Sequence, residues 1–600
     1  MQLPSNTPNR KPYDGSVRKL VIAFDVGTTF SGVSYAILDP GEVPETQPVT
    51  SFPAQAKVGG SAKIPSIVCY DKDGKVRAVG SEAEEPAFIE QAEDEGFVTV
   101  SWFKLHLRPE SLKLEFDFPA LPKNKTPLMV FSDFLRYLFE CTKSYIQKAN
   151  GTLVWNSVQP NIDFILAHPN GWEIAQQAQM RRAAIIAGLV SEAESQEHVH
   201  FVTEGEASLH FCIQRKIPLE QKDKGIIIVD AGGGTVDLSA YCQTAMGSFE
   251  EIVTSRCIGQ GSVFVGRRAH SYLQGKLKNS RFGSEQDVQL IASRFDAEAK
   301  HTFRKSEDSV YVKFGTFRDR DPSVDIKSGQ LKLPGCVVET FFEPSIKEII
   351  QAVKEQRSEA ATSIGAVFLA GGFSASDWLF SSLKNALEPL GLTVRRPDAH
   401  LNKAVADGAL SYYLDHFVSA RVAWLTYGTD CARPYNPSNI EHMRRRHTMA
   451  TRPSGRQVIP SGFSTIISKG VLVHEETEFK EHYVLESSIR SVYNHFSADI
   501  MVYRGRSSCP EWTDVEPRMF STWGTVYADL SDVAEISGFR DGRIYFNADF
   551  EVVILFGGPE IKAQVSWQEN VSLLYPSKID LCPDYLSGER KEVGLPTLFL

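Results

Sequence analysis

We expect an α/β protein with a duplicated fold and a β-rich C-terminal region, and three features of the 600-residue sequence predict it. Residues Leu20–Tyr35 (LVIAFDVGTTFSGVSY) and Ile226–Tyr241 (IIIVDAGGGTVDLSAY) repeat one pattern: an apolar run, an Asp, a turn rich in Gly and Thr, and a second apolar run. Between about 20 and 415, strand-like and helix-like stretches alternate, as in α/β proteins. After about 415, short strand-like runs separated by turn residues replace the helices, which is typical of an all-β unit.

The expected elements follow from apolar runs and their period. Short apolar runs bounded by turn residues predict strands, and an apolar period of 3.6 residues predicts a helix. The stretch 278–335 is more charged and irregular, so we expect a small inserted lobe there. The expected strands are 20–24, 61–70, 162–167, 225–230 and 367–370, the expected helices are 127–148 and 173–186, and the expected C-terminal strands are 463–468, 471–473, 482–485, 500–503, 543–546 and 549–556.

Composition and charge exclude several function classes. The formal net charge of -10 argues against a general nucleic-acid-binding protein, which usually carries a basic domain. No apolar run is long enough to span a bilayer, so we expect no membrane span. Nine cysteines without a CxxC pair fit reduced thiols in a cytoplasmic or nuclear protein. The chain is too long for one core, and its polar N-terminus, residues 1–18, is expected to be a flexible tail.

The two Gly/Thr turns have the composition of phosphate-binding turns. Glycine lets backbone N–H groups approach phosphate oxygens closely, and threonine hydroxyls add donors. Neither turn is a P-loop, because the pattern GxxxxGK[ST] does not occur. The expected phosphate contacts are Gly27, Thr28 and Thr29 in the first turn, and Gly232, Gly233, Gly234 and Thr235 in the second.

An aspartate precedes each turn. Asp25 and Asp230 end their predicted strands and are expected to point into a shared cleft. Two carboxylates facing a triphosphate predict Mg²⁺ held through water molecules, because Mg²⁺ gives up its waters reluctantly. Asp237, seven residues after Asp230, is expected to orient an attacking water or to hold a second ion. The alternative is that the two turns are unrelated glycine turns of a Rossmann-like protein.

A third segment fits an adenosine site. Residues 367–376 read VFLAGGFSAS, a strand that ends in Gly371 and Gly372. A pair of glycines permits close approach to a flat ring or a ribose. Turns of this kind are common, and it is the order of the three segments along the chain that favours adenosine binding.

Together these segments resemble the actin-like ATPases, and within them the heat shock protein 70 family. DVGTT resembles the first phosphate motif of that family, DAGGGTVD the second, and LAGGFSAS the adenosine motif. Residues 167–189 resemble its strand–helix unit between the phosphate motifs, and 202–209 (VTEGEASL) its connecting segment. The resemblance covers residues 20–415, and the departures, with FGGPEI at 556–561, point to the divergent branch called heat shock 70 kDa protein 12.

The resemblance implies roles for particular residues. Asp25 and Asp230 would hold hydrated Mg²⁺, Glu204 would lie in the hinge and help to set the water shell of the metal, and Asp237 would position water or a potassium ion. Lys104 would stabilise charge on the γ-phosphate, although by sequence alone it is only a lysine beside aromatic residues. Lys300 aligns with a lysine that touches ribose and adenine, and Gly371, Gly372 and Phe373 would contact the nucleoside.

Several positions depart from the family pattern. Ala375 stands where the family has an arginine that stacks on adenine, His301 replaces an arginine, and the acidic residue expected near Lys300 is shifted. Base recognition is therefore expected to be looser. No Leu-rich linker follows Gly408. We also expect neither the helical lid nor the acidic co-chaperone tail of the family.

We expect three parts: a tail (1–18), a nucleotide-binding domain of the heat-shock-70 type (19–415), and a β-rich domain (416–600) that is either a divergent substrate- or partner-binding sandwich or a stabilising domain. The expected function is an ATP-binding, chaperone-like ATPase of the stress response, hydrolysing ATP to ADP and phosphate. Unfolded or client proteins and co-chaperones would be its partners. The alternatives are a nucleotide-binding signalling scaffold with little turnover and, less favoured, a small-molecule kinase.

Overall fold

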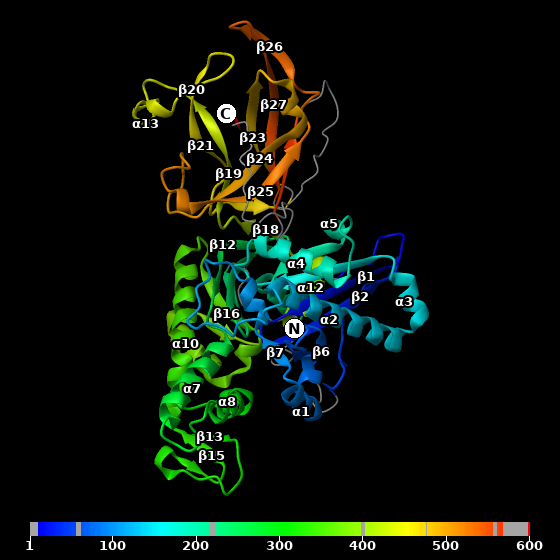
Figure 1. Cartoon of the computed structure of the whole chain (residues 1–600), viewed down its shortest axis with the longest axis vertical. Coiled ribbons are helices and arrows are strands. Elements are labelled where there is room, and N and C mark those ends of the chain that lie inside the picture. The colour runs from blue at the N-terminus through cyan, green and yellow to red at the C-terminus, as the bar shows by residue number, and fades with distance from the viewer. Residues whose placement is uncertain are drawn as a thin grey trace. The chain divides into compact units, whose positions relative to one another are not determined.

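The computed structural model describes residues 10–55, 62–215, 224–397, 403–475, 477–555, 561–567 and 598–599 (Figure 1). Two compact units make up the chain, Met1–Val418 and Ser419–Leu600. We call them the N-terminal unit and the C-terminal unit. Residues 1–9 of the expected tail and residues 556–560 of the expected FGGPEI motif lie outside the described residues. Most of the chain after residue 567, where a lid would follow, also lies outside them.

The first lobe of the N-terminal unit is built on a sheet with strand order β3-β2-β1-β8-β9. Strands β1 and β2 form an antiparallel hairpin, whereas β8 and β9 continue the sheet in parallel. Helix α2 (Pro127–Asn150) packs against α4 (Ile174–Ala187), which ends at Gly188 in the left-handed conformation. The strands are β1 (Lys19–Val26), β2 (Phe30–Leu38), β3 (Gln47–Pro48), β8 (Ile162–His168) and β9 (Val199–Thr203).

The second lobe repeats this plan. Its strands follow the order β12-β11-β10-β16-β17, with an antiparallel β10–β11 hairpin and parallel β16 and β17. The hairpin and the two parallel strands therefore occupy equivalent positions in both lobes, which confirms the duplicated actin-like fold that the two repeated segments predict. The strands are β10 (Gly225–Ala231), β11 (Val236–Gln243), β12 (Phe249–Ile258), β16 (Ile364–Ala370) and β17 (Thr393–Arg395), and the helices include α7 (Ser262–Leu277), α10 (Gly335–Glu359) and α11 (Asp377–Leu387).

Two helices cross in close contact within this unit. Helix α6 (Glu204–Gln214) follows β9 and packs against α12 (Ala404–Asp415). A Cβ added to Gly408 of α12 would lie 1.8 Å from the carbonyl oxygen of Ala207 in α6, so only glycine permits this approach. Residues of α12 pack on β1 and β8 of the first lobe, and residues of α6 pack on β10 of the second. The two helices thus connect the cores of the two lobes.

The expected inserted lobe contains regular structure. Helix α8 (Glu285–Arg294) and a three-stranded sheet of β13 (Val310–Lys313), β15 (Gln330–Leu333) and β14 (Ile326–Lys327) occupy it. Its buried residues belong to the same apolar cluster as those of β10 and α10, so the insertion is packed onto the second lobe.

One expected strand is divided in the structure. The sequence predicts a single strand over 61–70, but β4 (Lys63–Pro65) pairs with β2, whereas β5 (Ile67–Tyr70) belongs to a separate sheet with β6 (Val76–Val79) and β7 (Val98–Ser101). The break falls at Ser66, whose N–H donates to the Thr29 carbonyl and whose hydroxyl donates to the Gly27 carbonyl, both within 2.8 Å. The segment is therefore bent by its attachment to the first Gly/Thr turn.

The described part of the expected tail is attached to the lobe. Arg10 forms an ion pair with Asp415 at 2.8 Å, and Tyr13 exchanges backbone hydrogen bonds with the turn at Gly41 and Glu42. No described helix is long and apolar enough to cross a membrane. The eight cysteines within the described residues are all free thiols.

The C-terminal unit is β-rich, as expected, with sheet orders β20-β21-β19-β24-β25 and β23-β27-β26, and β28 beside β27. Tyr483, Phe496 and Phe550 are fully buried in its core. The predicted strands 543–546 and 549–556 merge into one, and β19, β25 and β26 were not predicted. The strands are β19 (Thr426–Pro434), β20 (Ala450–Thr451), β21 (Gln457–Ile467), β23 (Glu478–Ser487), β24 (Phe496–Tyr503), β25 (Phe520–Ala528), β26 (Glu535–Arg540), β27 (Arg543–Leu555) and β28 (Lys562–Ser566).

Candidate nucleotide site

The two Gly/Thr turns connect equivalent hairpins. Asp25 lies opposite Gly32 in the first hairpin, and Asp230 lies opposite Asp237 in the second. Each Asp is therefore the last residue but one of its strand, directly before the turn. The structure thus places both aspartates at the ends of central strands, where the sequence predicts them.

The turns contact each other across the two lobes. A Cβ added to Gly233 would lie 2.5 Å from Thr29 Oγ1, and one added to Gly234 would lie 2.5 Å from Thr28 Oγ1. Glycine is required here because a side chain would displace the opposite threonine. Residues 204 and 206 positions apart in sequence thus lie together, with glycine backbone on one side and threonine hydroxyls on the other.

The second turn is held by the start of α7. The N–H of Ser262 donates to the Gly232 carbonyl at 3.1 Å, and that of Val263 to the Gly233 carbonyl at 3.0 Å. The N–H of Gly232 donates to the Thr235 carbonyl at 2.9 Å, which closes the turn. With its carbonyls bonded in this way, the turn is preorganised.

Four buried carboxylates lie around the turns: those of Asp25, Glu204, Asp230 and Asp237. Burial, the Glu204 carboxylate and the Asp25 carboxylate raise the pKa of Asp230 to about 7, against an opposing hydrogen bond from Ser208. Burial and Glu204 also raise the pKa of Asp237 well above its ordinary value. The Asp230 carboxyl is thus affected by Glu204 and Asp25, and the Asp237 carboxyl by Glu204 and Asp230.

Two lysines enter this acidic cluster. Nζ of Lys104 lies 2.5 Å from Oε1 of Glu204 and 5.5 Å from the centre of the Trp172 ring. Lys104 is only 3% exposed, so it is buried among these groups and is not a surface lysine. Nζ of Lys63, which the sequence did not single out, lies 2.6 Å from Oδ2 of Asp25.

The donor set fits a hydrated cation. The four carboxylates outnumber Lys63 and Lys104 by two, and Oδ2 of Asp237 is buried without a hydrogen-bond partner in the described part of the chain. Among the described residues, no group of three or more His, Cys, Asp or Glu side chains is arranged to hold a metal ion. A Mg²⁺ ion that keeps most of its waters needs few protein ligands, and the unbalanced negative charge favours a cation.

The predicted adenosine motif joins this cluster. Gly371 follows β16 with φ +80°, and a Cβ on it would lie 2.4 Å from Oδ1 of Asp230. A side chain is thus excluded by both conformation and space. Gly372 and Phe373 begin a 3-10 turn, and the Phe373 ring stacks on Phe342 at 6.1 Å.

Lys300 lies in the second lobe at the end of a π-helical turn, Phe295–Ala299. Its Nζ forms an ion pair with Asp296 at 2.6 Å, although Lys300 is only 4% exposed. A Cβ on Gly266 would lie 2.6 Å from Asp296 Oδ1, so α7 packs closely beside this pair.

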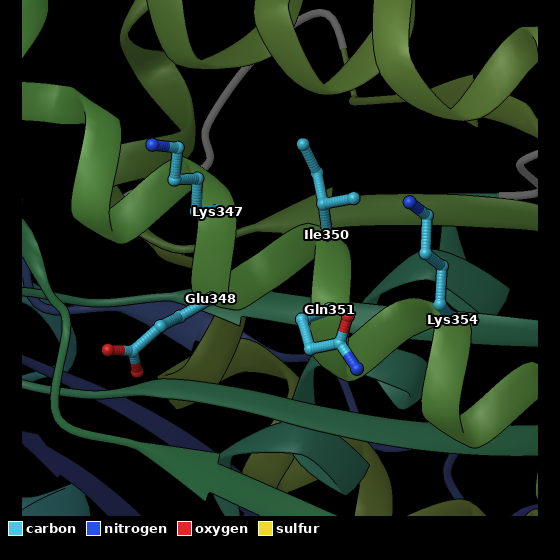
Figure 2. A pocket seen from close by; sticks show the side chains of 5 residues that line it. All are labelled: Lys347, Glu348, Ile350, Gln351 and Lys354. Atoms are coloured by element: carbon cyan, nitrogen blue, oxygen red, sulfur yellow. The ribbon is translucent and has the colours of Figure 1, made fainter.

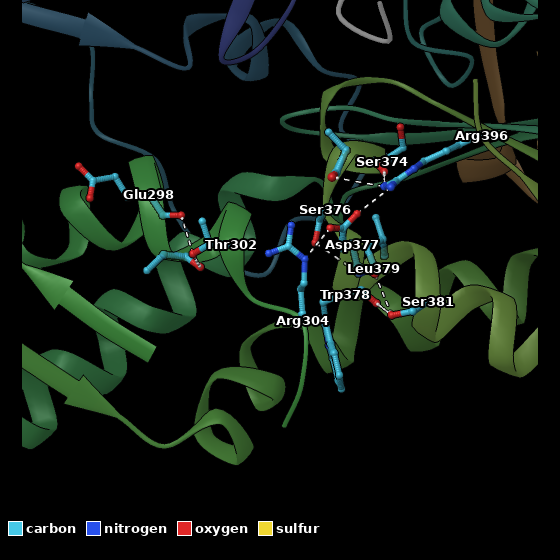
Figure 3. Close-up of polar contacts among 12 residues, drawn as sticks. Glu298, Thr302, Arg304, Ser374, Ser376, Asp377, Trp378, Leu379, Ser381 and Arg396 are labelled. Carbon is cyan, nitrogen blue, oxygen red and sulfur yellow. Dashed lines mark hydrogen bonds and ion pairs between the residues drawn. The ribbon is translucent and has the colours of Figure 1, made fainter. Parts of the chain in front are cut away.

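Two arginines hold the adenosine motif in place, and the sequence did not predict them (Figure 3). Arg396 donates to the Ser374 carbonyl at 3.0 Å and to Asp377 Oδ1 at 2.7 Å. Arg304, one turn after Lys300, donates to Asp377 Oδ2 at 2.9 Å. One carboxylate thus connects the Lys300 segment to the segment that follows Gly371 and Gly372.

The structure places the two turns, the four carboxylates, Lys104 and Gly371 near one another, and Arg304 connects the Lys300 segment to Asp377 after the adenosine motif. It adds Lys63, Ser208, Asn170 and Asp377, which no sequence pattern indicated. A shallow pocket of about 420 Å³ on α10 is separate from these residues; it is lined by Lys347, Glu348, Ile350, Gln351 and Lys354 (Figure 2).

These two lobes and the β-rich region define the class of protein: an actin-like ATPase fold followed by a β-rich C-terminal region. No family model matches the chain. Mouse (Mus musculus) "Heat shock 70 kDa protein 12A" is 23% identical over 69% of this chain and 72% of the relative. "Heat shock 70 kDa protein 12B" of Homo sapiens is 21% identical over 72% of this chain and 74% of the relative. "Chaperone protein DnaK" of Endomicrobium trichonymphae is 23% identical over 59% of this chain and 51% of the relative. The chain is a divergent heat-shock-protein-70-like protein, as its motifs predict.

Proposed function

We propose that this protein is an ATP-binding, chaperone-like ATPase that requires Mg²⁺. One observation carries the proposal: Gly233 and Gly234 of the second turn contact Thr29 and Thr28 of the first, with Lys104 among buried carboxylates beside them. A glycine turn packed against threonine hydroxyls, next to a buried lysine, suits a triphosphate. The similarity to proteins named as heat shock proteins and chaperones supports the same class.

In this proposal the residues act by position and charge. Thr28, Thr29 and the glycine turn bind the phosphates, and Lys104 leaves Glu204 to contact the γ-phosphate. Asp237, with one oxygen bonded to the Asn170 N–H and the other without a described partner, orients the attacking water and accepts its proton. When bound through water to Asp25 and Asp230, Mg²⁺ supplies positive charge that offsets the charge of the phosphates. Catalysis of this kind rests on positioning and electrostatics.

The nucleoside would lie beside the second lobe. Gly371, Gly372 and Phe373 would contact the ribose and base. The ion pair with Asp296 would direct Lys300 toward the ribose and base. Ala375 stands where the family has an arginine. The two ion pairs of Asp377, with Arg304 and Arg396, would hold the segment after Gly372 in place.

ATP binding would favour closure of the two lobes, and ATP hydrolysis would let the lobes open again. To move the protein from mostly open to mostly closed, ATP must bind the closed form more favourably than the open form by about 5 kcal/mol. We propose that client proteins bind through the C-terminal unit and that co-chaperones modulate the cycle, in the cytoplasm or nucleus. A potassium ion beside Asp237 is a further component of this proposal.

Single-turnover hydrolysis tests the function. Labelled ATP is mixed with excess full-length protein and Mg²⁺, and bound nucleotide and released phosphate are followed separately. Conversion of bound ATP to ADP supports the ATPase. Bound ATP that stays intact favours the nucleotide-binding scaffold, and failure to bind ATP contradicts both.

A further inference from the structure

Asn170 lies in the loop after β8, at the boundary between the two lobes. Asn170 is only 8% exposed, although it belongs to the irregular segment 169–173 between β8 and α4. A buried amide must be hydrogen-bonded, because leaving it without partners costs free energy. Its partners therefore show what the residue holds together.

The Asn170 side chain binds the second lobe. Its Nδ2 donates to Ser239 Oγ at 2.9 Å and to the Leu238 carbonyl at 3.2 Å, both in β11. A longer contact of 3.4 Å reaches the Arg256 carbonyl of β12. One amide group of the first lobe is thus attached to two neighbouring strands of the second.

The same residue binds α6 and Asp237. Asn170 Oδ1 accepts from the N–H of Gly205, the second residue of α6, at 3.3 Å. The Asn170 backbone N–H donates to Oδ1 of Asp237 at 2.7 Å. Asn170 is therefore bonded directly to Asp237 and to the residue that follows Glu204.

Two glycines make this packing possible. A Cβ on Gly205 would lie 2.6 Å from Ser239 Oγ and 3.0 Å from the Asn170 amide. A Cβ on Gly171 would lie 2.8 Å from the Cys257 side chain in β12. Larger residues at either position would separate the loop from the second lobe, so the sequence is locally adapted to this contact.

We propose that Asn170 is a positioning residue that ties the first lobe to β11 and α6, and thereby fixes Asp237 relative to Glu204. One oxygen of Asp237 is held by the Asn170 N–H, which leaves the other for water. The catalytic part of this inference rests on the proposed ATPase function; the connection between the lobes does not.

Hydrogen exchange of the nucleotide-free, full-length protein tests the connection. Asn170→Ala keeps the backbone N–H but removes the amide group, so exchange at the Gly205 N–H and in β11 should be at least about tenfold faster than in the wild type. Asn161→Ala is the matched control, because Asn161 precedes the same strand and its side-chain amide donates a 3.4 Å bond to the Arg18 carbonyl, away from Gly205 and β11. It should leave exchange at Gly205 unchanged.

Single-turnover kinetics test the positioning. Asn170→Ala should slow conversion of bound ATP about 10- to 100-fold while the Kd for ATP changes less than about threefold, because Asn170 would act on Asp237 and not on the nucleotide. A merely structural role would weaken binding and conversion together. Ser239→Ala removes one partner of the amide with little risk to folding, and its effect should be less than additive with that of Asn170→Ala.

If Asn170→Ala leaves hydrogen exchange at the Gly205 N–H unchanged, the inference that Asn170 connects the two lobes is wrong. Faster exchange with an unchanged rate of conversion, or additive effects with Ser239→Ala, would overturn the positioning role. A wild-type protein that binds no ATP would refute the proposed function and with it the catalytic part, while the exchange measurement still decides whether Asn170 connects the lobes.

Discussion

Nζ of Lys104 and Oε1 of Glu204 lie 2.5 Å apart, and both side chains are buried. The pair joins the 3-10 turn Phe103–Leu107 of the first lobe to the first residue of α6. A buried ion pair is costly to break from one side, because the remaining charge is left without compensation. In the function proposed above, the same lysine exchanges Glu204 for a phosphate when ATP binds.

Lys104→Met should destabilise the nucleotide-free protein by about 3–5 kcal/mol, because Glu204 then lies uncompensated beside Asp230. It should also slow single-turnover hydrolysis at least about 100-fold. The double variant Lys104→Met/Glu204→Gln should recover most of the stability and none of the activity. Denaturant unfolding and phosphate release measure the two effects. A double variant with wild-type turnover would show that Lys104 has no catalytic role.

Asp230→Asn should stabilise the nucleotide-free protein at high pH. The folded-state pKa of Asp230 is about 7, above its ordinary value of 3.8, so the folded protein binds the extra proton and this group's contribution to stability falls as pH rises between these values. The variant should match the wild type near pH 3, below both pKa values, and exceed its stability by roughly 1–2 kcal/mol at pH 5 and roughly 4 kcal/mol at pH 8.

The same variant should lose at least about 100-fold in ATP turnover, because it removes a positioned catalytic carboxylate. Asp73→Asn, which changes an exposed carboxylate of the first lobe, is the control for both measurements. Turnover within about threefold of wild type would contradict the proposed mechanism.

Asp377→Asn should weaken ATP binding about three- to tenfold and leave the rate of conversion of bound ATP nearly unchanged. It loosens the attachment of Arg304 and Arg396, and with it the 3-10 turn Gly372–Ala375. Equilibrium binding of a fluorescent ATP analogue measures the effect. Asp319→Asn is the control. It alters the ion pair of Asp319 with Arg281 and should leave both the affinity for ATP and the rate of conversion unchanged. If Asp377→Asn and Asp319→Asn bind ATP equally well, Arg304 and Arg396 do not support the nucleoside site.

A fragment of residues 1–418 should bind ATP with a Kd within about threefold of the full chain. It contains both Gly/Thr turns, all four buried carboxylates, the apolar cores of both lobes and the Arg10–Asp415 pair. Isothermal titration of the purified fragment checks this expectation. An insoluble or non-binding fragment would show that the C-terminal unit is part of the ATPase core.

Local patterns in the sequence predict much of the fold. The central strands of both lobes, α2 and α4 are found near their expected positions, because apolar period and turn residues act over short distances. Strand 61–70 is divided because Ser66 binds the turn at Gly27, a contact with a residue far away in sequence. The sequence does not predict strands β25 and β26, because β25 is mostly half-buried, β26 is mostly exposed, and no apolar alternation marks them.

The sequence by itself determined the duplication, the aspartates before each turn, and the glycines and threonines that suit phosphate, since each lies within one short segment. Only the tertiary structure decided that Lys63 pairs with Asp25, Ser208 with Asp230, and Asn170 with Asp237. The physical reason is that each of these pairs joins different secondary-structure elements. A polar residue's role depends on which acceptor or donor the fold brings to it, and its identity alone does not specify that partner.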